Sequence, residues 1–409
     1  NPRHSINKVP HHKVIGPRIA QTLERYLTAH PQAQSDILAA IGAPKDQRKG
    51  PDKWYVNACR KLVGQLLGAD LSNDPQLTEL SAPLIYAWAT AAKGPDTPLL
   101  QWLYTGAPAG IEEHPQHAGI FPVSEEPPSG EFELQTEAEG HRNYKTMDQS
   151  PHGYEVLMKM VDAGFVTRYD SLEEAIKGCG GKDLVLSKMA LITTTTKEGH
   201  LKHRLILDCR VSGSNSATKK WERILLPKVS DVLADSMLLK ALHEADPESQ
   251  ITYFVCDFSD AFFAVPLNPT ERRYFTGQYK KKVYVWNRVT QGSLDGPTLY
   301  GRLAALVGRF TQSLLPVDRA RVQIYVDDPI VVICAPPALT DRIISMICLA
   351  WLVMGFSLAF HKAQRGRRVT WVGYDILDTE VGTRIQIKQD FLDQLREDTA
   401  NLLAKNVMS

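Results

Sequence analysis

The chain has 409 residues, of which 43% are hydrophobic and 23% charged, and its formal net charge is +1. This composition is ordinary for a folded globular protein, and the length is too great for one core, so we expect two or three domains. No uninterrupted apolar run reaches the ~18 residues that span a bilayer, and no apolar signal region opens the chain. The near-zero net charge does not by itself indicate nucleic-acid binding.

Residues 1–110 show the apolar spacing of α-helices. Ile19, Leu23 and Leu27 recur at four-residue intervals, which places them on one helical face. We therefore predict a small, mostly helical N-terminal domain, or an interaction arm, with no motif that carries chemistry. Residues 111–153 are rich in Gly, Pro and Glu and are predicted to form an extended linker.

From residue 154 to 377 the sequence predicts densely alternating strands and helices. Two β-rich runs, at 187–196 and 202–208, are joined by Lys197-Glu198-Gly199-His200, which is the pattern of a hairpin. Lys197 and Arg204 lie seven residues apart on this hairpin. They are either a pair of functional cations or two ordinary surface charges.

Three aspartates are the main candidates for chemistry. Asp257 ends the apolar run 251–256, and Asp327-Asp328 lies between the apolar runs 321–324 and 330–333. The second pattern predicts two strands joined by a tight turn with both carboxylates at its tip. Adjacent like charges are costly unless a cation shares them, so the three carboxylates are candidate ligands of two Mg²⁺ ions. The alternative is a solvated turn.

The residue after this pair is a proline, Pro329. Proline has no backbone N–H to contribute to a sheet. We therefore expect the strand that follows the turn to begin weakly or to lie at a sheet edge.

Several further segments complete the pattern. Gln291-Gly292-Ser293 begins a Gly-rich turn before a predicted helix at 299–310, and an apolar segment at 351–360 runs into His361-Lys362-Ala363-Gln364. The run 369–374 predicts a strand pair, and 390–405 predicts an amphipathic helix.

Taken in order, these segments resemble the motifs of reverse transcriptases from retroviral or retroelement Pol polyproteins. The resemblance covers roughly 155–377. It implies an α+β fold in which 154–377 form the fingers and palm of a right-hand polymerase. Residues 378–409 would be a C-terminal hairpin and helix leading to a thumb, which is not recognisable here.

The resemblance also implies roles for individual residues. The metals would be two Mg²⁺ ions, with Mn²⁺ as an alternative. The bulky ring of Phe262 would exclude a ribose 2′-hydroxyl, so that the product is DNA. Alternatively, Phe262 is a core aromatic. Asp295 departs from the small residues of the family and is expected to alter how the templating base is held. The implied catalytic residues are the three metal ligands Asp257, Asp327 and Asp328, together with Lys362 beside the leaving pyrophosphate. The residues implied to contact the dNTP are Lys197, Arg204, Ala261, Phe262 and Gln291. The primer grip would be formed by Trp371, Gly373 and Tyr374.

The function that follows is RNA-directed DNA synthesis on a primer 3′ end by two-metal phosphoryl transfer. Its partners would be an RNA or DNA template with primer and dNTPs, with no membrane. The rival hypothesis is an exapted, non-catalytic reverse-transcriptase-like domain that binds RNA within a ribonucleoprotein, and residues 1–150 would contact such partners. The sequence does not indicate an oligomeric state.

Six cysteines are scattered along the chain without the paired spacing of a metal site. Several lie in apolar, strand-like stretches, which favours buried free thiols in a reducing intracellular compartment. These cysteines are Cys59, Cys179, Cys209, Cys256, Cys334 and Cys348.

Overall fold

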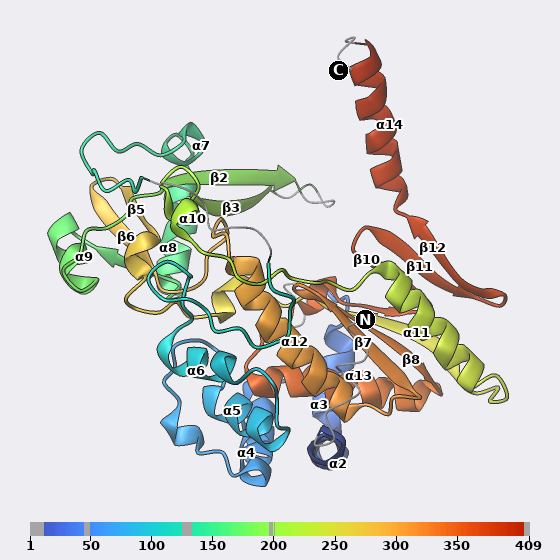
Figure 1. The fold of residues 1–409 in the computed structure, drawn as a ribbon. Helices are drawn as coiled ribbons and strands as arrows, with labels where there is room; N and C mark the ends of the chain where they lie inside the picture. The colour runs from blue at the N-terminus through green and yellow to red at the C-terminus, as the bar shows by residue number, and fades with distance from the viewer. Residues whose placement is uncertain (1–11, 45–49, 125–132, 196–198, 200, 405–409) are drawn as a thin grey trace.

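The computed structural model describes residues 12–44, 50–124, 133–195, 199 and 201–404. Antiparallel sheets alternate with helices, and a group of helices precedes them along the chain (Figure 1). The predicted α+β class with N-terminal helices is confirmed.

The central sheet has four antiparallel strands in the order β7-β8-β4-β9. They are β7 (Ala320–Tyr325), β8 (Asp328–Ala335), β4 (Gln250–Val255) and the short β9 (Gln364–Gly366). The two inner strands, β8 and β4, come from segments about 80 residues apart. Their pairing brings together the two sequence segments that carry the candidate aspartates.

Side chains alternate along these inner strands between two cores, as the period of a β-strand requires. On one face, Phe254, Val331 and Ile333 lie in the largest hydrophobic cluster. The helices packed there are α12 (Gly296–Leu314) and α13 (Pro337–Met354). Length and composition alone would let α13 cross a membrane, but 67% of it is buried inside the protein, which is the behaviour of a core helix.

The opposite face of the sheet has a smaller core. Tyr253 and Val332 lie there with side chains of α11 (Val229–Leu242) and of the hairpin formed by β10 (Arg368–Trp371) and β11 (Tyr374–Thr379). The sheet is therefore covered on both faces, which explains why its inner strands are almost uniformly apolar.

The N-terminal helices belong to the same core as α12 and α13. The Arg60 side chain donates to the main-chain oxygens of Val353 and Leu352 at the end of α13, at 2.7 and 3.2 Å. The hydrophobic cluster runs from Ile15 into the central sheet without interruption, and the domain boundary at residue 110 stays a prediction. These helices are α2 (His12–Ala29), α3 (Pro31–Ala40), α4 (Lys53–Leu67), η1 (Leu71–Asn73), α5 (Ala82–Ala91) and α6 (Thr97–Thr105).

The remaining elements between residues 133 and 287 form a second lobe. The predicted hairpin is confirmed as β2 (Lys188–Thr195) paired with β3 (Leu201–Asp208), beside a three-stranded sheet in the order β1-β6-β5. The other elements of this lobe are α7 (Lys145–Asp148), α8 (Gly153–Asp162), β1 (Val166–Tyr169), α9 (Leu172–Gly178), α10 (Ser214–Ala217), η2 (Ala261–Ala264), η3 (Arg272–Tyr274), β5 (Thr276–Tyr279) and β6 (Lys282–Trp286).

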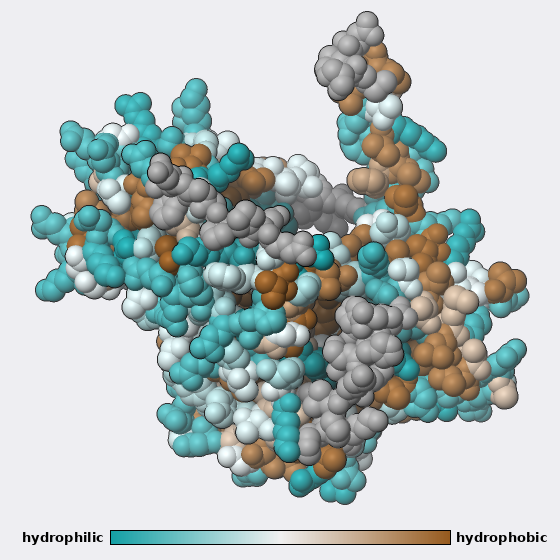
Figure 2. All heavy atoms as spheres, in the orientation of Figure 1, coloured by the Kyte–Doolittle hydropathy of each residue, from teal (hydrophilic) through white to brown (hydrophobic). Residues whose placement is uncertain are grey.

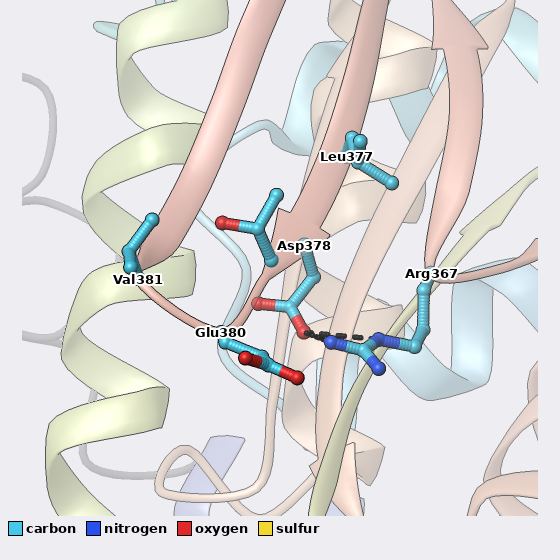
Figure 3. Close-up of a pocket in the computed structure, with 6 residues that line it drawn as sticks. Arg367, Leu377, Asp378, Glu380 and Val381 are labelled. Atoms are coloured by element: carbon cyan, nitrogen blue, oxygen red, sulfur yellow. Dashed lines mark hydrogen bonds and ion pairs between the residues drawn. The ribbon is translucent and has the colours of Figure 1, made fainter.

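The C-terminal part leaves the body of the protein. After η4 (Phe360–Lys362) and the hairpin of β11 and β12 (Gly382–Ile387), α14 (Gln389–Ala404) projects outward with no buried residue. Apolar side chains lie exposed along it (Figure 2). The tip of the hairpin borders an open pocket of about 560 Å³, where Arg367 pairs with Asp378 (Figure 3). None of the predicted site residues lines this pocket.

A buried ion pair ties α12 to the N-terminal helices. Arg302 is 1% exposed, and its Nε donates to Asp96 Oδ2 at 2.8 Å. The same guanidinium donates to the Gln116 main-chain oxygen at 2.8 Å and lies over the Trp102 ring. Asp96 also caps α6, accepting the Leu99 N–H, so one carboxylate serves two elements.

A second buried carboxylate, Asp295, lies close to this pair. It precedes α12, is 4% exposed, and its Oδ1 has no hydrogen-bond partner in the described part of the chain. It lines a cavity of about 10 Å³ with Glu222 and Arg302. Burial raises the pKa of Asp295 to about 7.

We predict that Arg302→Met lowers the free energy of unfolding by about 3–5 kcal/mol, because the Asp96 carboxylate would stay buried without its partner. Urea unfolding measures this change. The control is Lys159→Met, which removes an exposed ion pair with Glu155 and should cost less than ~1 kcal/mol. Equal losses in the two variants would contradict the role given to the buried pair.

We predict that Asp295→Asn stabilises the protein only at higher pH. The pKa of Asp295 in the folded protein, about 7, lies above its unfolded value of ~4, so its contribution to stability is present below pH ~4 and is lost as the pH rises through 7. Melting temperatures from pH 4 to 8 should therefore separate progressively, with the variant higher. A difference that does not change with pH would refute this account.

Candidate active site

Strand pairing brings the three candidate aspartates to one end of the central sheet. Asp257 follows β4 directly, Asp327 lies in the turn between β7 and β8, and Asp328 is the first residue of β8. The Phe258 N–H donates to the Asp327 main-chain oxygen at 3.0 Å. The two segments are thus joined main chain to main chain at the position of the carboxylates.

The turn itself has a strained backbone. Tyr325 pairs with Asp328, which leaves a two-residue turn, and Val326 adopts a φ of +54°. Tight hairpin turns favour positive φ, but a β-branched side chain rarely adopts it. Such strain persists only where the surroundings impose it, and it is common at functional sites.

The Trp371 side chain supports the turn by a hydrogen bond to the main chain of the turn. Its indole N–H donates to the Asp328 oxygen at 3.0 Å, and its ring lies edge-on to the Tyr325 ring. Trp371 is 2% exposed, so its side chain packs below the turn. Gly373 and the half-buried Tyr374 follow it at the turn of the β10–β11 hairpin, where Gly373 has a φ of +82°.

The sequence predicted that the strand carrying Pro329 would either begin weakly or lie at a sheet edge. The edge position is wrong, because β8 lies between β7 and β4. The strand begins weakly only on the side of β4, because its pairing with β7 already starts at Asp328. The paired register of β4 and β8 stops at Val255 with Ile330, and Pro329 only accepts a hydrogen bond there, from Cys256 N–H at 3.2 Å. The missing N–H of the proline explains why the ladder ends beside Asp257.

The charges of the three aspartates act on one another. Burial, together with the charge of Asp257, raises the pKa of Asp327. Burial, followed by the charges of Asp327 and Asp257, raises the pKa of Asp328 to about 6. Three carboxylates in mutual range are unfavourable unless cations lie among them.

Lys362, in η4, is a cation in direct contact with this cluster. Its Nζ forms an ion pair with Asp257, and its charge offsets part of the rise in the pKa of Asp327 and of Asp328. No group of three or more His, Cys, Asp or Glu side chains in the described ranges is arranged to hold a metal ion. The aspartates therefore share one electrostatic cluster, but in this conformation Asp257 faces a lysine.

The hairpin formed by β2 and β3 supplies a second cation. Arg204 lies on β3 opposite Ile192, and its charge offsets part of the rise in the pKa of Asp327. Lys197 lies outside the described residues. Arg204 is thus brought within electrostatic reach of the aspartates, although more than 120 residues separate it from the turn.

Ala261 and Phe262 lie in η2, four and five residues after Asp257. Phe262 is half-buried, and its ring stacks on Tyr300 of α12 with 5.6 Å between centroids. The contact with Tyr300 could not be predicted from the sequence, because this residue lies within an ordinary apolar helical run.

Gln291 lies in the turn before α12, next to Gly292. Gly292 has a φ of +112°, and a Cβ there would lie 2.2 Å from the Leu207 main-chain oxygen. Only glycine fits this contact between the turn and β3. The glycine therefore places Gln291 beside the hairpin formed by β2 and β3. Asp295, by contrast, is buried against Glu222 and Arg302.

Comparison with known proteins matches part of the chain. Residues 196–376 match the family described as "Reverse transcriptase (RNA-dependent DNA polymerase)". The chain is 27% identical over 151 residues to the Gag-Pro-Pol polyprotein of squirrel monkey retrovirus, which is 35% of this chain and 8% of that polyprotein.

Among solved structures, a foamy viral protease-reverse transcriptase in complex with double-stranded DNA is 17% identical, with a TM-score of 0.45 over 82% of this chain and 48% of that one. The same kind of protein in complex with an RNA/DNA hybrid is also 17% identical, with a TM-score of 0.42 over 82% of this chain and 37% of that one. The chain therefore spans less than half the length of these proteins. The matched segment contains β3, the three aspartates, β10 and the first half of β11, and the chain accordingly carries a reverse transcriptase domain over residues 196–376.

Proposed function

We propose that this chain is an RNA-directed DNA polymerase that adds dNTPs to a primer 3′ end. The observation that carries the proposal is the cluster of three aspartates at paired strand ends, two of which have a raised pKa. A non-catalytic scaffold has no physical need for such repulsion.

The donor set fits divalent metal ions. Asp257, Asp327 and Asp328 offer only carboxylate oxygens, the ligands that Mg²⁺ prefers, with Mn²⁺ as an alternative. Two bound ions would supply Lewis acidity toward the primer hydroxyl and the triphosphate. To reach all three carboxylates they would have to replace the lysine ammonium now paired with Asp257.

The cations around this cluster suit a triphosphate. Arg204 would grip phosphate oxygens with its planar guanidinium, and Lys197 would add a mobile charge. Lys362, released from Asp257, would donate a proton to the leaving pyrophosphate. Gln291, Ala261 and Phe262 would contact the incoming nucleotide.

The nucleic-acid partner would be a primed RNA or DNA template. Gly373 and Tyr374, at the turn of the hairpin whose Trp371 holds the Asp328 oxygen, would steady the primer end. This arrangement would link primer position to the geometry of the aspartates.

The cysteines suit a reducing intracellular compartment, which we propose as the site of action. All six lie in the described part of the chain, all are free, and five are buried. Burial raises the pKa of the Cys256 thiol, beside Asp257, to about 12, so this thiol is unreactive at neutral pH.

We predict that Asp257→Asn, Asp327→Asn and Asp328→Asn each lower nucleotide incorporation by roughly 10³-fold or more, because an amide carries no charge and binds Mg²⁺ poorly. Primer extension on an RNA template with Mg²⁺ measures the loss. The matched control is Asp341→Asn, an exposed carboxylate paired with Arg365.

Near-normal incorporation by the Asp257 or Asp327 variant would contradict the two-metal mechanism. If the unmodified chain binds RNA but incorporates no nucleotide, the rival hypothesis of a non-catalytic RNA-binding domain is favoured instead.

We predict that Phe262→Val lowers discrimination against ribonucleotides by on the order of 10²-fold, because a steric clash is removed while few favourable contacts are lost. The measurement is kcat/KM for matched dNTP and rNTP pairs. Phe263→Val is the control, since that neighbouring ring stacks on Phe165 instead. An unchanged ratio in the Phe262 variant would mean that this ring is only a core residue.

A further inference from the structure

Tyr300 connects the proposed sugar barrier with the aspartate cluster. It lies one turn into α12, is 0% exposed, and stacks on Phe262 with 29° between the ring planes. On the same helix, a Cβ at Gly296 would lie 3.5 Å from the Phe262 ring. The Phe262 ring is therefore seated on the first turns of α12.

The backbone that carries Phe262 is a weak support by itself. It belongs to η2, a 3₁₀ segment of four residues, and the residue before it, Asp260, has a φ of +54°. Short 3₁₀ segments have poorer hydrogen bonds than α-helices. The stacked ring on the long, buried α12 is thus the firmer restraint on where Phe262 lies.

The hydroxyl of Tyr300 is the unusual part of this contact. It is buried and has no hydrogen-bond partner among the described residues, which costs free energy that a phenylalanine would avoid. Burial, followed by the charges of Asp327, Asp257 and Asp328, raises the pKa of this phenol well above its ordinary value. The group therefore stays protonated beside the carboxylates.

We propose that Tyr300 is a positioning residue for sugar selection, a role that rests on the polymerase function proposed above. The Tyr300 ring holds the Phe262 ring at the place where the sugar would bind. Because α12 is packed in the hydrophobic core, Tyr300 itself is held firmly in position. Phe262 would touch the substrate, whereas Tyr300, being fully buried, would act only through Phe262.

The test compares two variants of Tyr300 in steady-state primer extension with matched dNTP and rNTP. Tyr300→Leu removes the stacking surface and should lower the dNTP-to-rNTP ratio of kcat/KM by roughly 10-fold, mainly through a lower KM for the rNTP. Tyr300→Phe keeps the ring and should leave the ratio unchanged, without lowering the melting temperature. Tyr300→Met replaces the leucine variant if that one does not fold.

A double variant separates positioning from a general loss of structure. In the Phe262→Val background there is no ring left to hold, so Tyr300→Leu should cause no further fall in the ratio. A structural defect would instead lower dNTP incorporation in both backgrounds and leave the ratio alone.

An unchanged ratio in Tyr300→Leu, or an equal fall in both backgrounds, would overturn the inference while the polymerase activity stands. Failure of the unmodified chain to incorporate any dNTP would overturn the proposed function, and the inference with it. The two failures are therefore distinguishable.

Discussion

The pairing of β4 with β8 is the constraint on which the rest of the site depends. It places Asp257 against the Asp327-Asp328 turn and so concentrates three like charges at one end of a buried sheet. The fold holds this arrangement in spite of the repulsion, through the main-chain bond from Phe258 to Asp327 and the indole bond from Trp371 to Asp328. Because these bonds use the main-chain oxygens of Asp327 and Asp328, they do not occupy the carboxylates of those two residues, which can then bind cations.

Helix α12 links the site to the rest of the molecule. Tyr300 faces Phe262 on one side, and Arg302, two residues later, enters a buried ion pair with Asp96 from the N-terminal helices. A helix restrained at successive turns by a hydrophobic core and by an ion pair is a rigid platform for a nearby ring. The N-terminal helices therefore contribute to the site indirectly, since they share the core in which α12 is packed.

The sequence predicted the elements whose pattern is local. The hairpin carrying Arg204, the turn at Asp327, the helix after Pro297 and the exposed amphipathic helix were all recognisable from alternation, helical spacing and turn residues. It could not predict contacts made across the fold. Tyr300 looked like any apolar helical residue, Asp295 was expected near the template but is buried beside Arg302, and Lys362 pairs with Asp257. Each of these depends on which distant segments meet, and periodicity does not encode that.

The most direct test of the central claim is a crystal structure of the chain with primed template, dNTP and Mn²⁺, read by anomalous scattering. The account predicts Mn²⁺ peaks bound by Asp257, Asp327 and Asp328, with the Lys362 ammonium displaced from Asp257. Peaks elsewhere with the aspartates bare, or a Lys362–Asp257 pair that persists beside bound nucleotide, would contradict it.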